Sequence, residues 1–362
     1  MSNIEWTDKT WNPTRGCSRV SRGCDNCYAI SQAVRHDWCK TGQSGTPRFG
    51  LYHGLTTLRK DKYDWTGVVR FAEDMLSVPL QRKKPTLYFV GSMSDVFHDS
   101  FTNLQIAMIF AVMAACPQHR FQLLTKRPER ALRWFTQTEF TDNESVRLTF
   151  KRALSSLTGV LGKRLHADVW ERLPEELRWP LPNVALGVSA EDQQRADERI
   201  PHLLATPAAV RFVSAEPLLG PLELEKWLRW HLIEDSSRAW PPNVTFSNRL
   251  DWVIVGGESG PRARPCDVGW LRDIVRQCHE ANVACFVKQL GAHVIDRNDA
   301  GFDGDDISEW PEETALEDFW KDPNRRYQGA PCRVLLADKK GGDPAEWPDD
   351  LRVRQWPGES AA

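Results

Sequence analysis

The stretch NVALGVSAEDQQRADERIPHLLATPAAVRFVSAEP, residues 183–217, decides the fold class. It opens with a short apolar run, continues with a helical pattern that starts with acidic residues, and closes with a second apolar run. Apolar runs of this length, bounded by turn signals, are typical of strands buried on both faces of a parallel sheet. A strand, a helix and a strand in succession predict a right-handed βαβ unit.

The same rhythm recurs on both sides of this stretch. Further strand-like runs lie at 86–95, 120–127, 250–260 and 283–291, with a weaker one at 6–16, and helical patterns at 101–117 and 267–282. Their number and order favour an α/β fold with a partial or complete (β/α) barrel. A doubly wound sheet is the alternative, but no GxGxxG turn follows the first strand and the chain has no Walker A motif.

Two segments fall outside the alternation. We expect a barrel domain at 1–295 with a helical insertion at about residues 135–182, because that interval is long for one crossover. Residues 296–362 contain nine Lys and Arg against seventeen Asp and Glu. We expect them to form an acidic, irregular C-terminal appendage packed on the barrel, anchored by Trp310, Trp320, Trp347 and Trp356.

Bulk composition excludes little else. The 362 residues carry a formal net charge of −2, which gives no global argument for nucleic acid or membrane. No apolar run approaches the roughly 18–20 residues that span a bilayer, and the polar N-terminus lacks a signal-peptide core. We therefore expect a cytoplasmic protein with no membrane partner, in which the nine cysteines are free or metal-bound.

The active site of an α/β barrel lies at the carboxyl ends of its strands. Polar or small residues terminate every predicted strand here, although strands also end in polar residues simply because the chain meets water. The strand-end candidates are Ser92, Ser94, Asp95, Thr125, Lys126, Arg127, Ser189, Glu191, Ser214, Glu216, Glu258, Ser259, Lys288 and Gln289.

Three cysteines lie at the end of the weak first strand, in RGCSRVSRGCDNCYA (residues 15–29). Thiolates are soft ligands suited to zinc or iron–sulfur clusters. A structural zinc site takes four ligands, so His36, Cys39 or His53 would have to complete it. The competing interpretation is a [4Fe–4S] cluster with three cysteine ligands and one open iron, and three accidental free thiols are the third.

Several motifs also carry a resemblance to known families. They are TWNPTRGCSRVSRGCDNCYA (10–29), GSMSDVFH (91–98), LLTKRPER (123–130), GVSAEDQ (187–193), SAEPLLGP (214–221), WVIVGGESG (252–260), FVKQLG (286–291) and DPAEWPDDLRVRQWP (343–357). On these the chain resembles the three-cysteine-motif proteins, a phage-associated family of unassigned function, and through them the radical S-adenosylmethionine superfamily. The first cysteine gap is six residues where that superfamily usually has three, and Asn26 stands where an aromatic residue is common.

The resemblance implies a barrel of radical S-adenosylmethionine type and roles for the candidates. Cys17, Cys24 and Cys27 would ligate three irons, and the open iron would bind S-adenosylmethionine, whose reductive cleavage yields a 5′-deoxyadenosyl radical with electrons from a donor protein. The cofactor-binding residues would be Gly91, Ser92, Ser94, Asp95, Ser189, Glu191, Gly256 and Gly257. The residues facing the substrate or the cofactor carboxylate would be Lys126, Arg127, Glu216, Glu258 and Lys288, all but Arg127 taken as catalytic candidates.

The substrate is indicated by surface composition and by the resemblance. Basic residues around the cysteines and in LRKDK (58–62) and QRKK (81–84), interleaved with aromatic ones, suit a nucleic acid or nucleotide, although they also suit a solvated face. The phage association and a similarity in kind to spore-photoproduct-lyase-like repair enzymes imply an enzyme that modifies or repairs a nucleic acid or nucleotide. The alternatives are a zinc-stabilised module that binds nucleic acid or a partner protein without catalysis, and a barrel hydrolase using Glu216 and Glu258.

Overall fold

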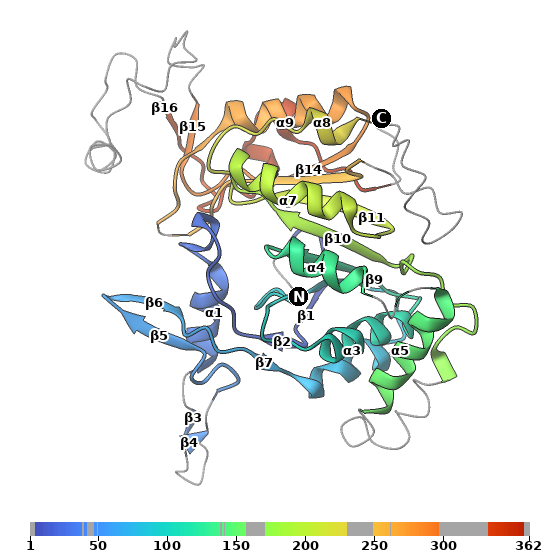
Figure 1. The fold of residues 1–362 in the computed structure, drawn as a ribbon. Coiled ribbons are helices and arrows are strands. Elements are labelled where there is room, and N and C mark those ends of the chain that lie inside the picture. Colours follow the sequence, from blue (N-terminus) through green and yellow to red (C-terminus); the bar gives the residue numbers. More distant parts are fainter. Residues whose placement is uncertain are drawn as a thin grey trace.

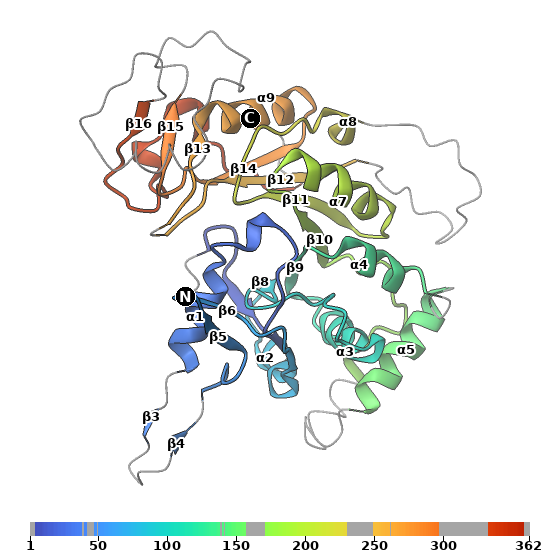
Figure 2. The same ribbon diagram turned by 60° about the vertical axis from the view of Figure 1, so that its left-hand side comes forward.

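In a computed structural model of the chain, the residues whose structure is described are 4–37, 40–41, 47–48, 50–137, 140, 142–156, 171–229, 249–260, 262–296 and 332–357. Figure 1 and Figure 2 show one curved parallel sheet with helices on its outer side. The statements below concern these residues.

The main sheet has seven parallel strands whose spatial order follows the chain. Its strands are β1 (Lys9–Trp11), β8 (Leu87–Val90), β9 (Arg120–Thr125), β10 (Val184–Ser189), β11 (Val210–Ala215), β12 (Trp252–Gly256) and β14 (Ala284–Gln289). The six predicted strands are thus confirmed, and the weak seventh is β1. The edge strands β1 and β14 do not pair with each other in the described part, so the sheet is a partial barrel rather than a complete one.

The helices that follow these strands begin where the sequence predicts. Thr102 caps α3 (Asn103–Ala114), and Asp192 and Asp267 cap α7 (Gln193–Ala205) and α9 (Val268–Glu280). Each side chain accepts a hydrogen bond from a backbone N–H of the first turn, which would otherwise lack a partner. The remaining helices are α2 (Ser77–Gln81), α4 (Pro128–Phe135), α5 (Asn143–Ser155) and α8 (Glu225–Leu228).

Alternate residues of the strands serve two different cores. On β10, Val184, Leu186 and Val188 face the helices in the outer core. The inner face carries a second cluster, here called the aromatic floor, formed by Trp6, Phe89, Phe212, Trp252, Ile254 and Phe286, with Trp356 against them. Gly187 makes room for it, because a Cβ there would lie 2.5 Å from the Phe212 ring.

Toward the carboxyl ends of the strands the inner face becomes polar. Two residues beyond Phe212, Ile254 and Phe286 come Ser214, Gly256 and Lys288. Because side chains alternate along a strand, these residues point to the same side as the aromatic floor. The floor therefore fills the inside of the half-barrel at one level and leaves a polar rim above it.

Smaller elements surround this rim. Cys17 follows β2 (Thr14–Arg15), which pairs with β7 (Arg70–Phe71). Helix α1 (Tyr28–Asp37) starts directly after Cys27. A hairpin of β5 (Thr56–Arg59) and β6 (Lys62–Trp65) projects beside α1 (Figure 1). The short pair β3 (Lys40–Thr41) and β4 (Pro47–Arg48) and the 3₁₀ helices η1 (Arg22–Cys24) and η2 (Glu73–Leu76) complete this half.

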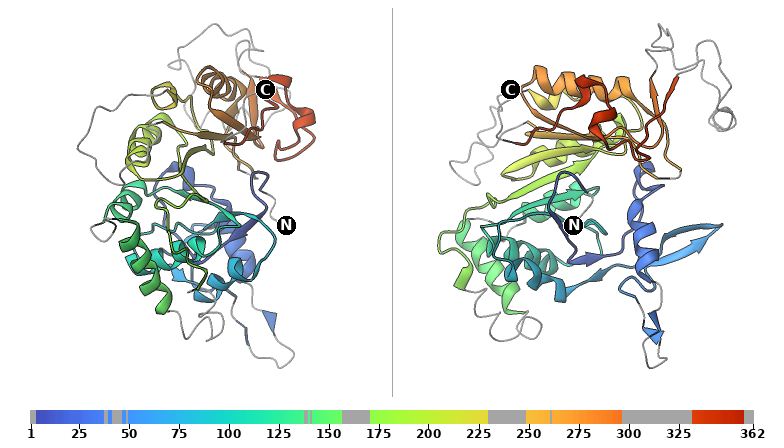
Figure 3. Two further views of the ribbon diagram at one scale, coloured as in Figure 1. Left: turned by 90° about the vertical axis from the view of Figure 1, so that its right-hand side faces the viewer. Right: turned by 180° about the vertical axis from the view of Figure 1, so that it is seen from behind.

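The C-terminal residues cover the far edge of the sheet, as the view from behind shows (Figure 3). The N–H of Val287 donates to Val353 and the N–H of Gln355 to Cys285, each at 2.8 Å, so residues 353–355 pair with β14. This pairing satisfies an otherwise open edge. The elements here are β13 (Cys266–Asp267), β15 (Val294–Asp296), β16 (Cys332–Val334), η5 (Pro344–Glu346) and η6 (Asp349–Leu351).

Two expected features can be located only in part. Helix α5 falls within the predicted insertion, while residues 157–170 lie outside the described part. Trp347 is 2% exposed and Trp356 packs on the aromatic floor, whereas Trp310 and Trp320 also lie outside the described residues. None of the described helices is both long and apolar enough to cross a membrane.

Candidate functional site

The cysteine loop, defined as residues 15–27, lies over the carboxyl ends of the central strands. Three sets of contacts, here called tethers, join the loop to these strand ends. Cys17, Cys24 and Cys27 are partly buried free thiols. Cys17 and Cys27 pack against an apolar cluster formed by Ala29, Ile30, Ala33, Tyr52, Leu55, Trp65 and Met93. The loop is thus part of a small core of its own, next to the start of α1.

The three thiols are electrostatic neighbours. Burial raises the pKa of Cys17 to about 11, with a further rise from Asp95 and a smaller one from Cys27, while Arg127 acts in the opposite direction. Burial also raises the pKa of Cys27, and Cys24 adds to that rise. The side chains of Cys17 and Cys27 are therefore neutral thiols at neutral pH when no metal is bound.

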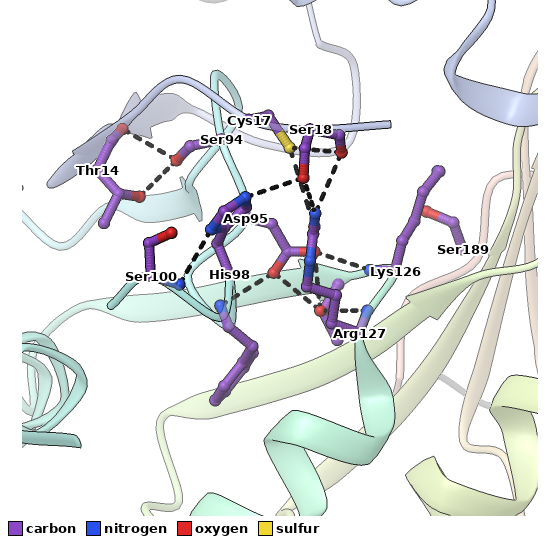
Figure 4. Close-up of polar contacts among 12 residues, drawn as sticks. Thr14, Cys17, Ser18, Ser94, Asp95, His98, Ser100, Lys126, Arg127 and Ser189 are labelled. Atoms are coloured by element: carbon purple, nitrogen blue, oxygen red, sulfur yellow. Dashed lines mark hydrogen bonds and ion pairs between the residues drawn. The ribbon is translucent and has the colours of Figure 1, made fainter. Parts of the chain in front are cut away.

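The first tether joins the ends of β8 and β9 to Cys17 (Figure 4). Asp95 is 5% exposed and accepts hydrogen bonds from the Thr125 hydroxyl, from the backbone N–H of Lys126 and, at 3.2 Å, from Nη1 of Arg127. The same Nη1 lies 3.9 Å from Sγ of Cys17. A buried carboxylate thus holds a guanidinium against a cysteine sulfur.

Ser18 and His98 extend this tether. Nη2 of Arg127 donates to the Ser18 carbonyl at 3.1 Å and to the Ser18 hydroxyl at 2.8 Å. Nδ1 of His98 accepts from the Ser100 N–H at 3.2 Å, so the ring proton is on Nε2, which lies 2.9 Å from the Ser18 hydroxyl. Burial and Arg127 lower the pKa of His98, which agrees with this neutral ring.

The second tether comes from β10. Glu191 is fully buried, lies 2.9 Å from Nη1 of Arg199, and accepts a hydrogen bond from the N–H of Gly23 at 3.3 Å. Burial alone would raise the pKa of Glu191, but Lys126 and Arg199 more than offset this and hold it below its ordinary value. Because a Cβ at position 23 would lie 2.8 Å from Cδ of Glu191, the glycine allows this close approach.

The third tether comes from β12. Glu258 is 6% exposed and forms an ion pair of 2.7 Å with Arg264, whose Nη1 donates to the carbonyl of Arg22. The amide of Asn26 donates to Glu258 at 3.0 Å. Burial acts to raise the pKa of Glu258, but the bonds from Arg264 and Asn26 outweigh it and lower the pKa.

Through these contacts, three of the predicted site residues bind other parts of the protein. Asp95, Glu191 and Glu258 each form an ion pair with an arginine. The cysteine loop is contacted by Arg127, by Arg264 and by the Glu191 carboxylate itself. The cofactor-binding role of Asp95 and Glu191 and the catalytic role of Glu258 stay predictions. Sequence reasoning did not find Arg199 or Arg264. Arg199 had one usable signal, because it lies on the apolar stripe of α7 with Ala196, Ile200 and Leu203.

The end of β8 is also occupied by internal contacts. The hydroxyl of Ser92 donates to the side chain of Asn12 at 3.0 Å, and the Ser92 carbonyl accepts from the hydroxyl of Tyr28 at 2.7 Å. Ser94 hydrogen-bonds the hydroxyl and carbonyl of Thr14. Gly91 has a φ of +76°, a conformation that glycine adopts without strain.

Other predicted residues remain on the polar rim. Nζ of Lys288 lies 2.9 Å from Oε1 of Glu216, which also accepts from Ser214 at 3.2 Å through its second oxygen. Gly256 is needed for this pair, because a Cβ there would lie 2.9 Å from Oε1 of Glu216. Lys126 forms no ion pair with the described residues, and its charge lowers the pKa of both Glu191 and Cys27.

Gly257 has a packing role. A Cβ at this position would lie 2.1 Å from the carbonyl oxygen of Leu290 and 2.9 Å from Cβ of Cys266. The backbone after β12 therefore fits directly against the segment after β14. Ser189, at the end of β10, is 2% exposed, and its carbonyl accepts from Arg199.

Comparison with known proteins assigns the chain to one family. The family described as protein of unknown function, DUF5131, matches residues 1–333. The chain belongs to the DUF5131 family. No curated protein and no solved structure gives a significant match.

The potential metal donors of this DUF5131 protein do not form a site for a single ion in the part that the structure describes. Within the described segments, no three His, Cys, Asp or Glu side chains converge closely enough to hold one. His53 lies 3.3 Å from Asp37 and His36 packs near Tyr52, so neither is directed at the thiols by these contacts. Cys39 lies outside the described residues.

Proposed function

We propose that this protein is an iron–sulfur enzyme of the radical S-adenosylmethionine type that modifies or repairs a nucleic acid, with Cys17, Cys24 and Cys27 as the cluster ligands. One observation carries the proposal. Three buried carboxylate–arginine pairs, from β8 with β9, from β10 and from β12, fix the cysteine loop over the carboxyl ends of a parallel half-barrel. That rim is where α/β barrels perform chemistry.

The number of ligands supports a cluster over a structural zinc. A structural zinc site is closed by four ligands, whereas three thiols leave one metal position open to a small molecule. The thiols do not converge on a single point in the described structure. When bound, a cluster with an open iron supplies the electron for reductive cleavage of S-adenosylmethionine.

The residues of the chain prepare the site for such a group. Arg127 donates to Cys17 and places a fixed positive charge beside it, which offsets the negative charge of a thiolate ligand. Lys126 adds a second positive charge near Cys27. Because Arg127 is itself bound by buried Asp95, its position is set before any group binds.

The polar rim offers contacts for the amino-acid and ribose groups of S-adenosylmethionine. Lys126 and the Glu216–Lys288 pair provide both signs of charge on the inner side of the sheet. Tyr28, 51% exposed, stands between the cysteine loop and the end of β8. The aromatic floor closes the inside of the half-barrel below these groups, so a substrate has to reach them from above the rim.

Glu216 and Glu258 do not favour a hydrolase. Each carboxylate already has its own cation, Lys288 for Glu216 and Arg264 for Glu258. A general acid has to be protonated near neutral pH, while the pKa of Glu258 is held below its ordinary value. Glu258 therefore lacks the raised pKa that a general acid in hydrolysis would need.

The test is metal content followed by turnover. Protein purified without oxygen should be brown, absorb broadly near 400 nm, and contain roughly four irons per chain. With S-adenosylmethionine and dithionite, it should form 5′-deoxyadenosine. Cys24→Ala should remove the colour and the product while the protein stays folded, and Cys116→Ala, which removes a thiol of the outer core, should keep both. A colourless protein with one zinc per chain would overturn the proposal in favour of a zinc-stabilised binding module.

A further inference from the structure

The β5–β6 hairpin projects beside α1 and is attached to the cysteine loop (Figure 1). Its two turn residues, Lys60 and Asp61, have φ angles of 44° and 62°. Two consecutive residues with positive φ form the tight two-residue turn that matches the twist of a hairpin. Beyond its base, the hairpin presents Leu58 and Tyr63, which are cross-strand partners and are 57% and 47% exposed.

The base of the hairpin is attached to the candidate site. Trp65 is 6% exposed and belongs to the apolar cluster against which Cys17 and Cys27 pack. Asp64 lies 2.8 Å from Nε of Arg19, and Nζ of Lys62 lies 3.2 Å from the side-chain oxygen of Asn26. The hairpin and the cysteine loop therefore form one unit.

Positive charge collects where this unit meets the loop after β12. The mouth patch, as we name it, consists of Arg19, Arg59, Lys62, Arg262 and Arg264. Its acidic neighbours are Asp25, Asp64 and Glu258, which pair with Arg19 and Arg264. Arg59, Lys62 and Arg262 form no ion pair with the residues the structure describes, so the patch has a surplus of cations.

The cations of the mouth patch act on one another. Burial lowers the pKa of Lys62, and the charges of Arg19, Arg262 and Arg264 lower it further. Mutual repulsion of this kind is relieved when an anion binds. The patch also spans three separate segments, at 19, at 59–62 and at 262–264, which suits an extended polyanion better than a single phosphate group.

We infer that the mouth patch binds the phosphate backbone of a single-stranded nucleic acid and leads it past the hairpin to the cysteine loop. Arg59, Lys62 and Arg262 contact phosphates, and Tyr63, on the opposite face of the hairpin, offers an aromatic surface to an unstacked base. This inference depends on the proposed function only for the choice of a nucleic acid as the substrate. The surface itself is argued from its own contacts and charges.

The test is fluorescence anisotropy with labelled 20-nucleotide DNA and RNA single strands over a range of salt concentrations. The double variant Lys62→Gln/Arg262→Gln should bind at least tenfold more weakly at 100 mM salt. Its dependence of log affinity on log salt should be shallower, by about 0.7 for each phosphate that the variant no longer neutralises. Glutamine at position 62 retains a donor for Asn26, so the loop should keep its place. The double variant Lys83→Gln/Lys84→Gln, in an exposed basic stretch elsewhere, is the matched control and should bind as the unchanged protein does.

Tyr63→Ala separates stacking from charge. It should weaken binding several-fold while leaving the salt dependence unchanged, because stacking releases no counterions. Comparing the DNA and RNA strands shows which of the two the protein takes.

Two results would overturn the inference: equal affinities for the mouth-patch and control variants, or no binding of either strand by the unchanged protein at 50 mM salt. The proposed enzyme is tested separately, because binding is measured on metal-free protein. If the protein binds the strands through the mouth patch but never holds iron, the proposed enzymatic function fails and the inferred nucleic-acid-binding surface stands.

Discussion

The carboxylate of Asp95 and the guanidinium of Arg127 lie 3.2 Å apart in a buried contact, and the same guanidinium nitrogen reaches the sulfur of Cys17 at 3.9 Å. Two strand ends thereby set the electrostatic environment of one cysteine. The arrangement resembles the way that outer carboxylates orient the ligands of metal sites.

The first prediction follows from the charge of Arg127. In reconstituted protein, Arg127→Gln should shift the reduction potential of the cluster to more negative values, because a nearby cation stabilises the reduced state. A shift on the order of 60 mV, a tenfold change for a one-electron couple, is expected. A redox titration followed by electron paramagnetic resonance measures it. Arg133→Gln, on the exposed side of the same helix, is the control and should leave the potential unchanged; an unchanged potential in Arg127→Gln would refute the role.

The second prediction concerns the dependence of stability on pH. Glu191 has a lowered pKa in the folded protein, so it stabilises the fold above its ordinary pKa of about 4.5, and this contribution is lost as the pH falls through the folded value. Glu191→Gln leaves Arg199 buried without its counterion and should cost about 3–5 kcal/mol at pH 7. Urea unfolding at pH 7 and pH 4 measures the gap between variant and unchanged protein. The gap should narrow at pH 4, and a constant gap would contradict the ionised pair.

The third prediction tests the aromatic floor. Gly187→Ala places a methyl group 2.5 Å from the ring of Phe212, so one of the two has to move. We expect a loss of about 1–3 kcal/mol in the free energy of unfolding. Phe212→Leu in the same chain should recover part of this loss, since the smaller side chain frees the space. Additive losses in the double variant would show that the two positions do not compete for one volume.

The fourth prediction tests the third tether. Glu258→Gln removes the charge that holds Arg264 and weakens the contact to Asn26, so the loop around Cys24 should open more often. Alkylation of Cys24 and Cys27 by iodoacetamide in metal-free protein, followed by mass spectrometry, should become several-fold faster. Glu280→Gln, which removes only an exposed pair with Arg276, should react at the original rate. Equal rates in both variants would mean that Glu258 does not hold the loop.

The strands and helices were predictable because their signals are local. Each strand is a short apolar run that ends in polar residues, and α3, α7 and α9 coincide with the predicted helical patterns. The parallel order then followed from the alternation of strands and helices. The sequence also predicted that the cysteines lie at the carboxyl ends of the strands, and the structure has the cysteine loop there.

The partners of the strand-end carboxylates could not be predicted in this way. Gly23 and Glu191 are 168 residues apart, and Asn26 and Glu258 are 232 apart, so nothing in either local pattern reveals the contact. An isolated Asp or Glu at a strand end reads equally as a ligand for a substrate and as an anchor for another loop. Only the structure shows that Arg127, Arg199 and Arg264 lie beside these carboxylates.

The aromatic floor joins the two ends of the chain, since Trp6 and Trp356 both pack on it, with Trp6 and Trp252 centroids 6.3 Å apart and Trp252 and Trp356 centroids 5.2 Å apart. During synthesis, Trp6 leaves the ribosome some 350 residues before Trp356. The half-barrel therefore completes its interior only after translation of nearly the whole chain. A chain that ends before residue 356 would leave the Trp252 ring without its Trp356 neighbour.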